Sequence, residues 1–496
     1  MRDGVDLVAD HYAPQSRQPV GTVLLRGPYR RDAPLAAVTA GVYAGRGYHV
    51  LLQSTRGTFG SGGTFEPGRN EVDDGADTVD WLCRQDWFTG SFATVGASYL
   101  GFTQLALLVE PRPELETAVI VMAPHDFGRA VWGTGSFALA DFLTWSFQMA
   151  RQHRGGWMRE LVRSTATPLW VDPVLRRLPL GAAARDLLGA QARFYESWLA
   201  HSEVTDDYWR QLQVVDALDE SRAPILLITG WPDAFVDQTL EQYRRLRSRG
   251  ADVTLIVGPW THGEGGGDAI RESLRWFDGD RQPSPVRIMV TGGGDWRDLS
   301  GWPPEFTERS LHLHPGRLAD EPQLTNGAAS RFVYDPADPT PTIGGRMLSV
   351  RVAGYRDDSR LATRPDVVAF TGQPLPEDLE VIGTPRVELV HSTDPPWADV
   401  FVRISEVDRK GRSRNVSDGY VRLNPERSPL LRLDMDAIAH RFRAGNRIRL
   451  IVAGGSFPRF ARNLGTGEPA ATGTRLARCT HVVDHAGSRL ILPIPT

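Results

Sequence analysis

The stretch TVGASYLGFTQ, residues 94–104, decides the fold and raises the question of function. A small β-branched run ends at Gly96, Ser98 follows two residues later, and Gly101 lies where a helix is expected to begin. Two interpretations are open: a tight strand-to-helix turn that needs small residues, or a serine nucleophile presented on a strained turn. The second requires a histidine and a carboxylate elsewhere, because a serine hydroxyl is a weak nucleophile without a base to take its proton.

Side chains of the required kinds follow two other apolar runs. ILLITG (225–230) is followed closely by Asp233 in GWPDAF, and VTLIVG (253–258) by His262 in GPWTHG. In α/β-hydrolases the chain order is serine, acid and histidine, each at the carboxyl end of a strand. The sequence therefore predicts a catalytic triad of Ser98, Asp233 and His262.

The pattern around this stretch predicts an α/β domain with an insertion. Over residues 1–126 and again over 215–307, apolar runs of four to six residues alternate with helical patterns. Such runs are typical of parallel strands that are covered on both faces. Residues 127–214 lack strand runs and contain six of the 14 tryptophans, so we expect a helical cap over a site.

The character of the sequence changes after residue 307. Short alternating runs such as RVELVHS (386–392) and NRIRLIVAG (446–454) are separated by Pro, Gly, Asp and Asn. This spacing predicts an all-β sandwich or jelly-roll, of the galactose-binding-like kind, over residues 308–496. The predicted fold class is therefore an α/β-hydrolase core with an inserted helical cap and a C-terminal β jelly-roll.

Composition narrows the function classes. The formal net charge of −4 gives no basic surface for nucleic acid and no polybasic patch for a membrane, and no run of about 18 apolar residues is present. Two cysteines, Cys83 and Cys479, exclude a disulfide framework, and the amino terminus lacks a secretory signal, so we expect a cytoplasmic location. His481 and His485, four apart in a predicted strand, do not predict a metal site, and we expect no metal or organic cofactor.

Several segments resemble one family of serine hydrolases, that of cocaine esterase and the X-Pro dipeptidyl-peptidases. GASYLG (96–101) is similar to its nucleophile segment, although Leu100 stands where the common G-x-S-x-G turn has glycine. The acid and base segments GWPDAF and GPWTH match as well. The resemblance continues through MRDGVDLVADHYAP (1–14), which looks like the family's opening hairpin, and through QSTRGTFGSGGTF (53–65), DGADTVDWLCRQDWFTGSFATVGASYLG (74–101) and SFPRFARN (456–463).

The resemblance implies a role for each residue of the site. Ser98 is expected to be the nucleophile, His262 the general base and then acid, and Asp233 the carboxylate that orients His262. The backbone N–H of Tyr99 and the hydroxyl of Tyr29 are expected to form the oxyanion hole. Two donors aimed at the developing negative charge suit acyl transfer, where removal of one costs about 3 kcal/mol.

The resemblance leaves the substrate open between a carboxylic ester and a short peptide. Relatives that bind a substrate amine carry acids two and three positions after the catalytic aspartate, where this chain has Phe235 and Val236. The resembling esterases carry an aromatic at the position of Phe235 and tryptophans at those of Trp132 and Trp145, which favours an ester with a bulky or aromatic acyl group. The other interpretation of the two tryptophans is that they fill the helical core of the cap. The alternative is an X-Pro dipeptidyl aminopeptidase or a related acyl or amide hydrolase. An amine site in the cap stays open because the cap also carries acids, namely Asp141, Glu160, Asp172, Asp186 and Glu196.

A different class of function is a catalytically silent binding protein whose jelly-roll recognises a carbohydrate or a protein partner. The complete set of Ser98, Asp233, His262 and Tyr29 argues against it, since a binding protein has no use for all four. We therefore expect a small-molecule ester or short peptide as the partner, and neither nucleic acid nor a membrane. The sequence leaves the oligomeric state open, a homo-oligomer included.

Overall fold

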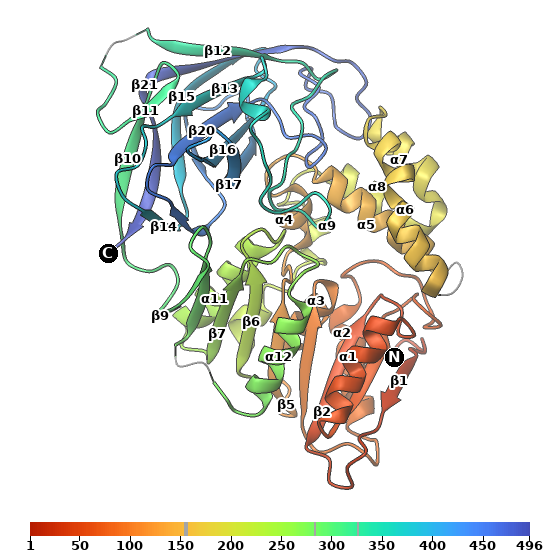
Figure 1. Cartoon of the computed structure of the whole chain (residues 1–496). Helices are drawn as coiled ribbons and strands as arrows, with labels where there is room; N and C mark the ends of the chain where they lie inside the picture. The colour runs from red at the N-terminus through yellow and green to blue at the C-terminus, as the bar shows by residue number, and fades with distance from the viewer. Residues whose placement is uncertain (153–156, 282–283, 325–326) are drawn as a thin grey trace.

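The computed structural model describes residues 1–152, 157–281, 284–324 and 327–496, without the side chains of residues 157 and 159–165. Figure 1 shows three parts: an α/β core at the bottom, a helical cap at the upper right and a β domain at the upper left. All three meet near helix α4 (Phe127–Trp132), above the upper ends of the core strands. Among the described residues, no helix combines the length and the apolar character needed to cross a membrane.

The core is built on a nine-stranded sheet of order β1-β3-β2-β4-β5-β6-β7-β8-β9. Strands β3 to β8 run parallel along this order, while β1 and β9 pair antiparallel at the two edges. The strands are β1 (Ala9–Tyr12), β2 (Gly21–Gly27), β3 (Tyr48–Ser54), β4 (Phe92–Ala97), β5 (Leu115–Val121), β6 (Ile225–Gly230), β7 (Val253–Gly258), β8 (Val286–Val290) and β9 (Asp295–Leu299).

The predicted opening hairpin is wrong in its pairing. Strand β1 pairs antiparallel with β3, not with β2, which follows it in the chain. Both edges of β2 are already taken by parallel neighbours, β3 on one side and β4 on the other. The free edge of β3 is therefore the position left for β1.

Helices cover both faces of the sheet, which explains the continuous apolar runs. Val23 and Leu25 of β2 pack on the face covered by α1 (Pro34–Gly45) and α12 (Gly266–Phe277). Leu24, between them, packs on the opposite face, which is covered by α2 (Glu71–Leu82), α3 (Tyr99–Leu108) and α11 (Val236–Ser248). Alternate side chains of one strand thus enter two different cores.

The cap lies between β5 and β6. Its aromatic side chains Phe142, Phe147 and Trp198 join the same core cluster as α3, so the cap packs directly on the core. After α4 come α5 (Leu139–Arg151), α6 (Trp157–Leu175), α7 (Leu180–Leu188), the 3₁₀ turn η1 (Gly189–Ala192), α8 (Phe194–Ala200), α9 (Asp207–Arg210) and α10 (Ala217–Glu220).

The C-terminal part is all β, apart from a short 3₁₀ turn, η2 (Leu361–Thr363). Nine strands follow the order β17-β16-β20-β13-β11-β10-β21-β15-β18, with β12 paired to β21, and β14 pairs separately with β19. The predicted fold class, an α/β core followed by an all-β domain, is confirmed. The strands are β10 (Phe306–His314), β11 (Arg317–Ala319), β12 (Ala329–Tyr334), β13 (Val367–Thr371), β14 (Leu379–Gly383), β15 (Arg386–Asp394), β16 (Asp399–Val407), β17 (Ser413–Arg422), β18 (Leu430–Asp434), β19 (Ile438–Phe442), β20 (Arg447–Ala453) and β21 (Cys479–Pro495).

Candidate active site

Ser98 occupies the single residue between β4 and α3. Its backbone has φ 58° and ψ −122°, a left-handed conformation that is strained for any residue except glycine. The helix can start this close to the strand because two glycines leave room. A Cβ on Gly96 would lie 2.4 Å from the amide nitrogen of Gln104, and one on Gly101 would lie 2.5 Å from Cβ of Ala123.

The unusual Leu100 is accommodated by a third glycine. A Cβ on Gly27, at the end of β2, would lie 2.3 Å from Cδ1 of Leu100. The leucine side chain therefore fills the space beside Gly27, and the spacing G-x-S-x-x-G is compatible with the same sharp turn as the common motif.

The structure brings Ser98, His262 and Asp233 together in one hydrogen-bonded chain. Nε2 of His262 lies 2.9 Å from Oγ of Ser98, and its Nδ1 lies 2.6 Å from Oδ1 of Asp233. Asp233 is fully buried, and its second oxygen accepts from the backbone N–H of Phe235 at 3.0 Å and from the hydroxyl of Thr229 at 3.2 Å. Because both carboxylate oxygens are occupied, Asp233 is held in one orientation.

Tyr29 and Tyr99 flank the serine from two directions. Tyr99 is the first residue of α3, so its N–H has no acceptor within the helix. The hydroxyl of Tyr29, just after β2, accepts from the indole N–H of Trp145 at 3.3 Å and also interacts with the Ser98 side chain. Burial raises the pKa of Tyr29, which keeps this hydroxyl protonated and able to donate.

A buried ion pair supports the Tyr99 ring. The Tyr99 hydroxyl donates to Glu71 at 2.9 Å and accepts from the N–H of Gly68 at 2.8 Å. The second carboxylate oxygen of Glu71 lies 3.2 Å from the guanidinium of Arg26, and both side chains are almost fully buried. Burial nevertheless raises the pKa of Glu71. Sequence reasoning missed this pair, since an acid in the first turn of a helix is ordinary there.

Aromatic side chains pack against the residues that contact or flank Ser98. The Trp145 ring stacks on Tyr99 with centroids 6.2 Å apart and on Trp198 with centroids 5.9 Å apart. Phe235 is 6% exposed and meets the His262 ring edge-on at 5.2 Å. Trp132 lies deeper in the cap, where its indole N–H donates to the carbonyl of Trp198 at 2.7 Å.

One of the cap acids, Asp141 of α5, lies buried beside the site. It accepts from the backbone N–H of Leu348 at 2.9 Å, and its charge interacts with those of Arg459, His262 and Asp233. Burial raises the pKa of Asp141 to about 6. The other described acids face solvent: Asp172 is exposed, Asp186 pairs with Arg177 and Glu196 with Arg185, while Glu160 lies outside the described side chains.

Within the described residues, no group of three or more His, Cys, Asp or Glu side chains is arranged to hold a metal ion. His481 lies on β21, where its Nδ1 is 3.1 Å from Nε2 of His391, and His485 contacts the hydroxyl of Ser330. These histidines are thus engaged within the β domain.

Comparison with known proteins agrees with the fold. Across 100% of this chain and 97% of that protein, the sequence is 28% identical to cocaine esterase of Rhodococcus sp. (strain MB1 Bresler). A solved aminopeptidase from the marine sediment archaeon Thaumarchaeota archaeon has the same fold, with a TM-score of 0.85, 23% identity and coverage of 99% of this chain and 94% of that one. An α-amino acid ester hydrolase follows with a TM-score of 0.83, 22% identity and coverage of 100% and 95%.

Two family models account for most of the chain. Residues 279–490 match the C-terminal non-catalytic domain of X-Pro dipeptidyl-peptidases, a range that holds most of the β domain together with the last two core strands, β8 and β9. Residues 3–264, from the amino terminus to just beyond His262, match the X-Pro dipeptidyl-peptidase (S15 family) model. The chain therefore belongs to the S15 family and is a serine hydrolase related to cocaine esterase.

Proposed function

We propose that this hydrolase cleaves carboxylic esters through an acyl-enzyme on Ser98, with a preference for bulky or aromatic acyl groups. The observation that carries the proposal is the hydrogen-bonded chain from Ser98 through His262 to the buried Asp233, with Ser98 on a strained turn. The 28% identity to cocaine esterase across the whole chain supports an ester as the substrate.

The geometry fits acyl transfer to water in two steps. Oγ of Ser98 attacks the ester carbonyl while Nε2 of His262 takes the hydroxyl proton, and the imidazolium then gives that proton to the leaving alcohol. Water enters, and its oxygen attacks the acyl carbon while Nε2 of His262 takes one of its protons. The bond from the acyl carbon to Oγ then breaks, the imidazolium returns the proton to Oγ of Ser98, and the acid is released. Asp233 holds the histidine tautomer that carries its proton on Nδ1 and stabilises the imidazolium.

Two donors are available for the oxyanion that forms in each step. The N–H of Tyr99 is free of helical hydrogen bonding. The hydroxyl of Tyr29 carries its proton at neutral pH, and burial raises its pKa further. Since Trp145 donates to the Tyr29 oxygen, the hydroxyl proton of Tyr29 is not used in that contact and is left for another acceptor. Donors held in place before the reaction contribute most when charge develops in a buried site.

The preference for a bulky acyl group follows from the aromatic side chains. Phe235 packs against His262, and Trp145 stacks on Tyr99, so a flat apolar acyl group bound at Ser98 meets ring faces and edges. Trp132 contributes indirectly, because its indole N–H donates to the carbonyl of Trp198, which stacks on Trp145. Phe235 has no carboxylate with which to form an ion pair with a substrate ammonium.

The second candidate, an X-Pro dipeptidyl aminopeptidase, is favoured by one observation. Asp141 is a buried carboxylate close enough to interact with His262, and a desolvated substrate amine requires such a partner. With a pKa of about 6, Asp141 is mostly ionised at neutral pH. Asp141, one of the acids noted in the predicted cap, is thus the residue that would bind the substrate amine in a peptidase.

A paired assay separates the two candidates. Purified protein and its Ser98→Ala variant are given nitrophenyl esters from acetyl to benzoyl and, separately, Xaa-Pro nitroanilides. Ester cleavage that depends on Ser98, rises toward benzoyl and is not accompanied by nitroaniline release supports the esterase. Fast Xaa-Pro cleavage that is lost in Asp141→Asn supports the peptidase. Unreactive Ser98 toward a fluorophosphonate contradicts both and leaves a binding protein.

A further inference from the structure

We propose that Arg346 is a positioning residue through which the β domain holds the loop that carries Asp233. The proposal rests on the proposed function, in which Asp233 orients His262. Arg346 lies in the long connection between β12 and β13, more than one hundred residues after Asp233 in the chain, yet it contacts both sides of that loop.

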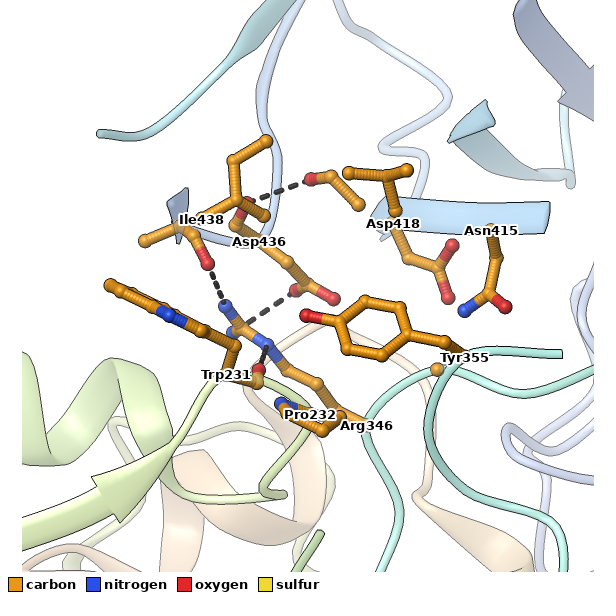
Figure 2. Close-up of a pocket in the computed structure, with 12 residues that line it drawn as sticks. Trp231, Pro232, Arg346, Tyr355, Asn415, Asp418, Asp436 and Ile438 are labelled. Carbon is orange, nitrogen blue, oxygen red and sulfur yellow. Dashed lines mark hydrogen bonds and ion pairs between the residues drawn. The ribbon is translucent and has the colours of Figure 1, made fainter. Parts of the chain in front are cut away.

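The guanidinium of Arg346 bridges the core and the β domain (Figure 2). On the core side, Nε donates to the carbonyl of Trp231 at 3.3 Å. Nη1 also lies 2.6 Å from a carboxylate oxygen of Asp237. On the β-domain side, Nη2 donates to the carbonyl of Ala437 at 3.2 Å, and Nη1 lies 3.1 Å from Asp436. The Arg346 side chain is 4% exposed, so these contacts replace water at every nitrogen.

The two core partners enclose the candidate catalytic acid. Trp231 lies two residues before Asp233, and Asp237 lies four residues after it, in the first turn of α11. Between them, the N–H of Phe235 donates to Oδ2 of Asp233. A shift of this loop would therefore move both the carboxylate and a donor that orients it, and a displacement of about 1 Å is enough to lower catalysis by about 10²-fold.

The same segment reaches the other parts of the site. The N–H of Leu348 donates to Asp141 in the cap. Val350 packs on the residue after the histidine, since a Cβ on Gly263 would lie 2.5 Å from its Cγ1. The stretch 346–350 thus contacts the loop that carries Asp233 (residues 231–237, the acid loop), the cap and the loop that carries His262. Arg346 makes the contact with the acid loop.

A second ion pair between the core and the β domain, whose arginine is less buried than Arg346, provides a control. Arg297 of β9 binds Glu380 of β14 through two contacts, of 2.5 and 3.0 Å. It joins the same two parts of the chain, but its partner Glu380 belongs to β14 and not to the loop of Asp233. Replacing Arg297 therefore weakens only the contact between the core and the β domain. Replacing Arg346 weakens that contact and also the hold on the loop of Asp233.

The test compares Arg346→Met, Arg346→Lys and Asp237→Asn with Arg297→Met, in full-length protein, on the best nitrophenyl ester. We expect Arg346→Met to lower kcat 10- to 100-fold with KM within threefold, and Arg297→Met to stay within twofold. Arg346→Lys keeps the charge but cannot reach both carbonyls, so we expect a loss between these values. In proton NMR, the far-downfield resonance of the His262–Asp233 hydrogen bond should broaden in Arg346→Met and persist in Arg297→Met.

Asp237→Asn keeps the test decisive if Arg346→Met does not fold, because Asp237 is largely exposed and its replacement removes one contact. We expect a loss of several-fold in kcat. Folded Arg346 and Asp237 variants that match Arg297→Met in kcat and in the NMR resonance overturn the inference. Asp233→Asn separates this from failure of the proposed function: if it retains full activity, the proposed role of Asp233 is wrong, whatever Arg346 does.

Discussion

The indole N–H of Trp145 donates to the hydroxyl oxygen of Tyr29 at 3.3 Å, from a cap helix to the end of a core strand. Tyr29 also interacts with Ser98, so the contact links the cap to the nucleophile through one phenol. A phenol hydroxyl has one proton, and an indole that occupies its oxygen leaves this proton for another acceptor. The cap therefore affects how the candidate oxyanion donor points.

Removing the indole donor should weaken the reaction without abolishing it. We expect Trp145→Phe to lower kcat about fivefold, the effect of one hydrogen bond worth about 1 kcal/mol. Tyr29→Phe, which removes the donor itself, should lower kcat about 10²-fold. The double variant should match Tyr29→Phe, because the two changes act on one hydroxyl. Steady-state kinetics on a nitrophenyl ester decides, and fully additive losses would mean that Trp145 acts apart from Tyr29.

The contact between Gly27 and Leu100 gives a prediction about the turn at Ser98. Gly27→Ala should destabilise the protein by about 1–3 kcal/mol and lower kcat, because its Cβ would overlap Cδ1 and Cγ of Leu100. Leu100→Ala in the same chain should restore both, since it removes the overlapping atoms. Thermal melting and kcat are measured for both variants. A Gly27→Ala protein that is as stable and as active as the wild type would show that the leucine simply moves aside.

The sequence predicts the site residues that directly follow regular strands, but not those whose contacts join parts of the chain far apart in sequence. Ser98, Asp233 and His262 each follow a continuous apolar strand, and β4, β5, β6 and β7 are successive neighbours in the sheet. Parallel strands place their carboxyl ends at one edge, so the apolar runs were enough to predict that these three side chains meet.

The supporting residues could not be predicted in the same way. Arg346 lies 115 residues from Trp231 in a different domain, and no periodicity connects a loop arginine with a backbone carbonyl at that range. Glu71 and Arg26 were missed because charged residues are expected to face solvent, and their burial depends on how α2 packs on β2. The pairing of β1 was likewise decided by which strand edge stayed free.

The carboxyl of Asp141 predicts a dependence of stability on pH. Burial raises its pKa from 3.8 to about 6, so the fold disfavours the ionised form, and stability is lost as the pH rises from about 4 to above 6. Arg459 and His262 favour ionisation and Asp233 opposes it, and their effects are already part of this value. Asp141→Asn should therefore be more stable than the wild type above pH 6, by roughly 2–3 kcal/mol.

The Asp141 prediction is checked by denaturant unfolding at pH 4.5, 6 and 8. Asparagine retains an oxygen for the N–H of Leu348, so the hydrogen bond survives the change. The difference between variant and wild type should grow with pH and be smallest at pH 4.5. A difference that is constant with pH would mean that Asp141 does not titrate in this range.

Tyr99→Phe tests whether Tyr99 acts through its main chain or its side chain. The variant keeps the N–H proposed for the oxyanion hole but removes the hydroxyl that binds Glu71 and Gly68. A buried carboxylate oxygen and a buried N–H then lose a partner, so we expect a loss of about 1–3 kcal/mol in stability. We expect kcat to stay within about threefold, because the backbone donor remains. Melting temperature and kcat are compared with Tyr29→Phe, which should show the reverse pattern. A 10²-fold loss of kcat in Tyr99→Phe would place the hydroxyl itself in the reaction, and the network of Glu71 and Arg26 would then support chemistry and not only the fold.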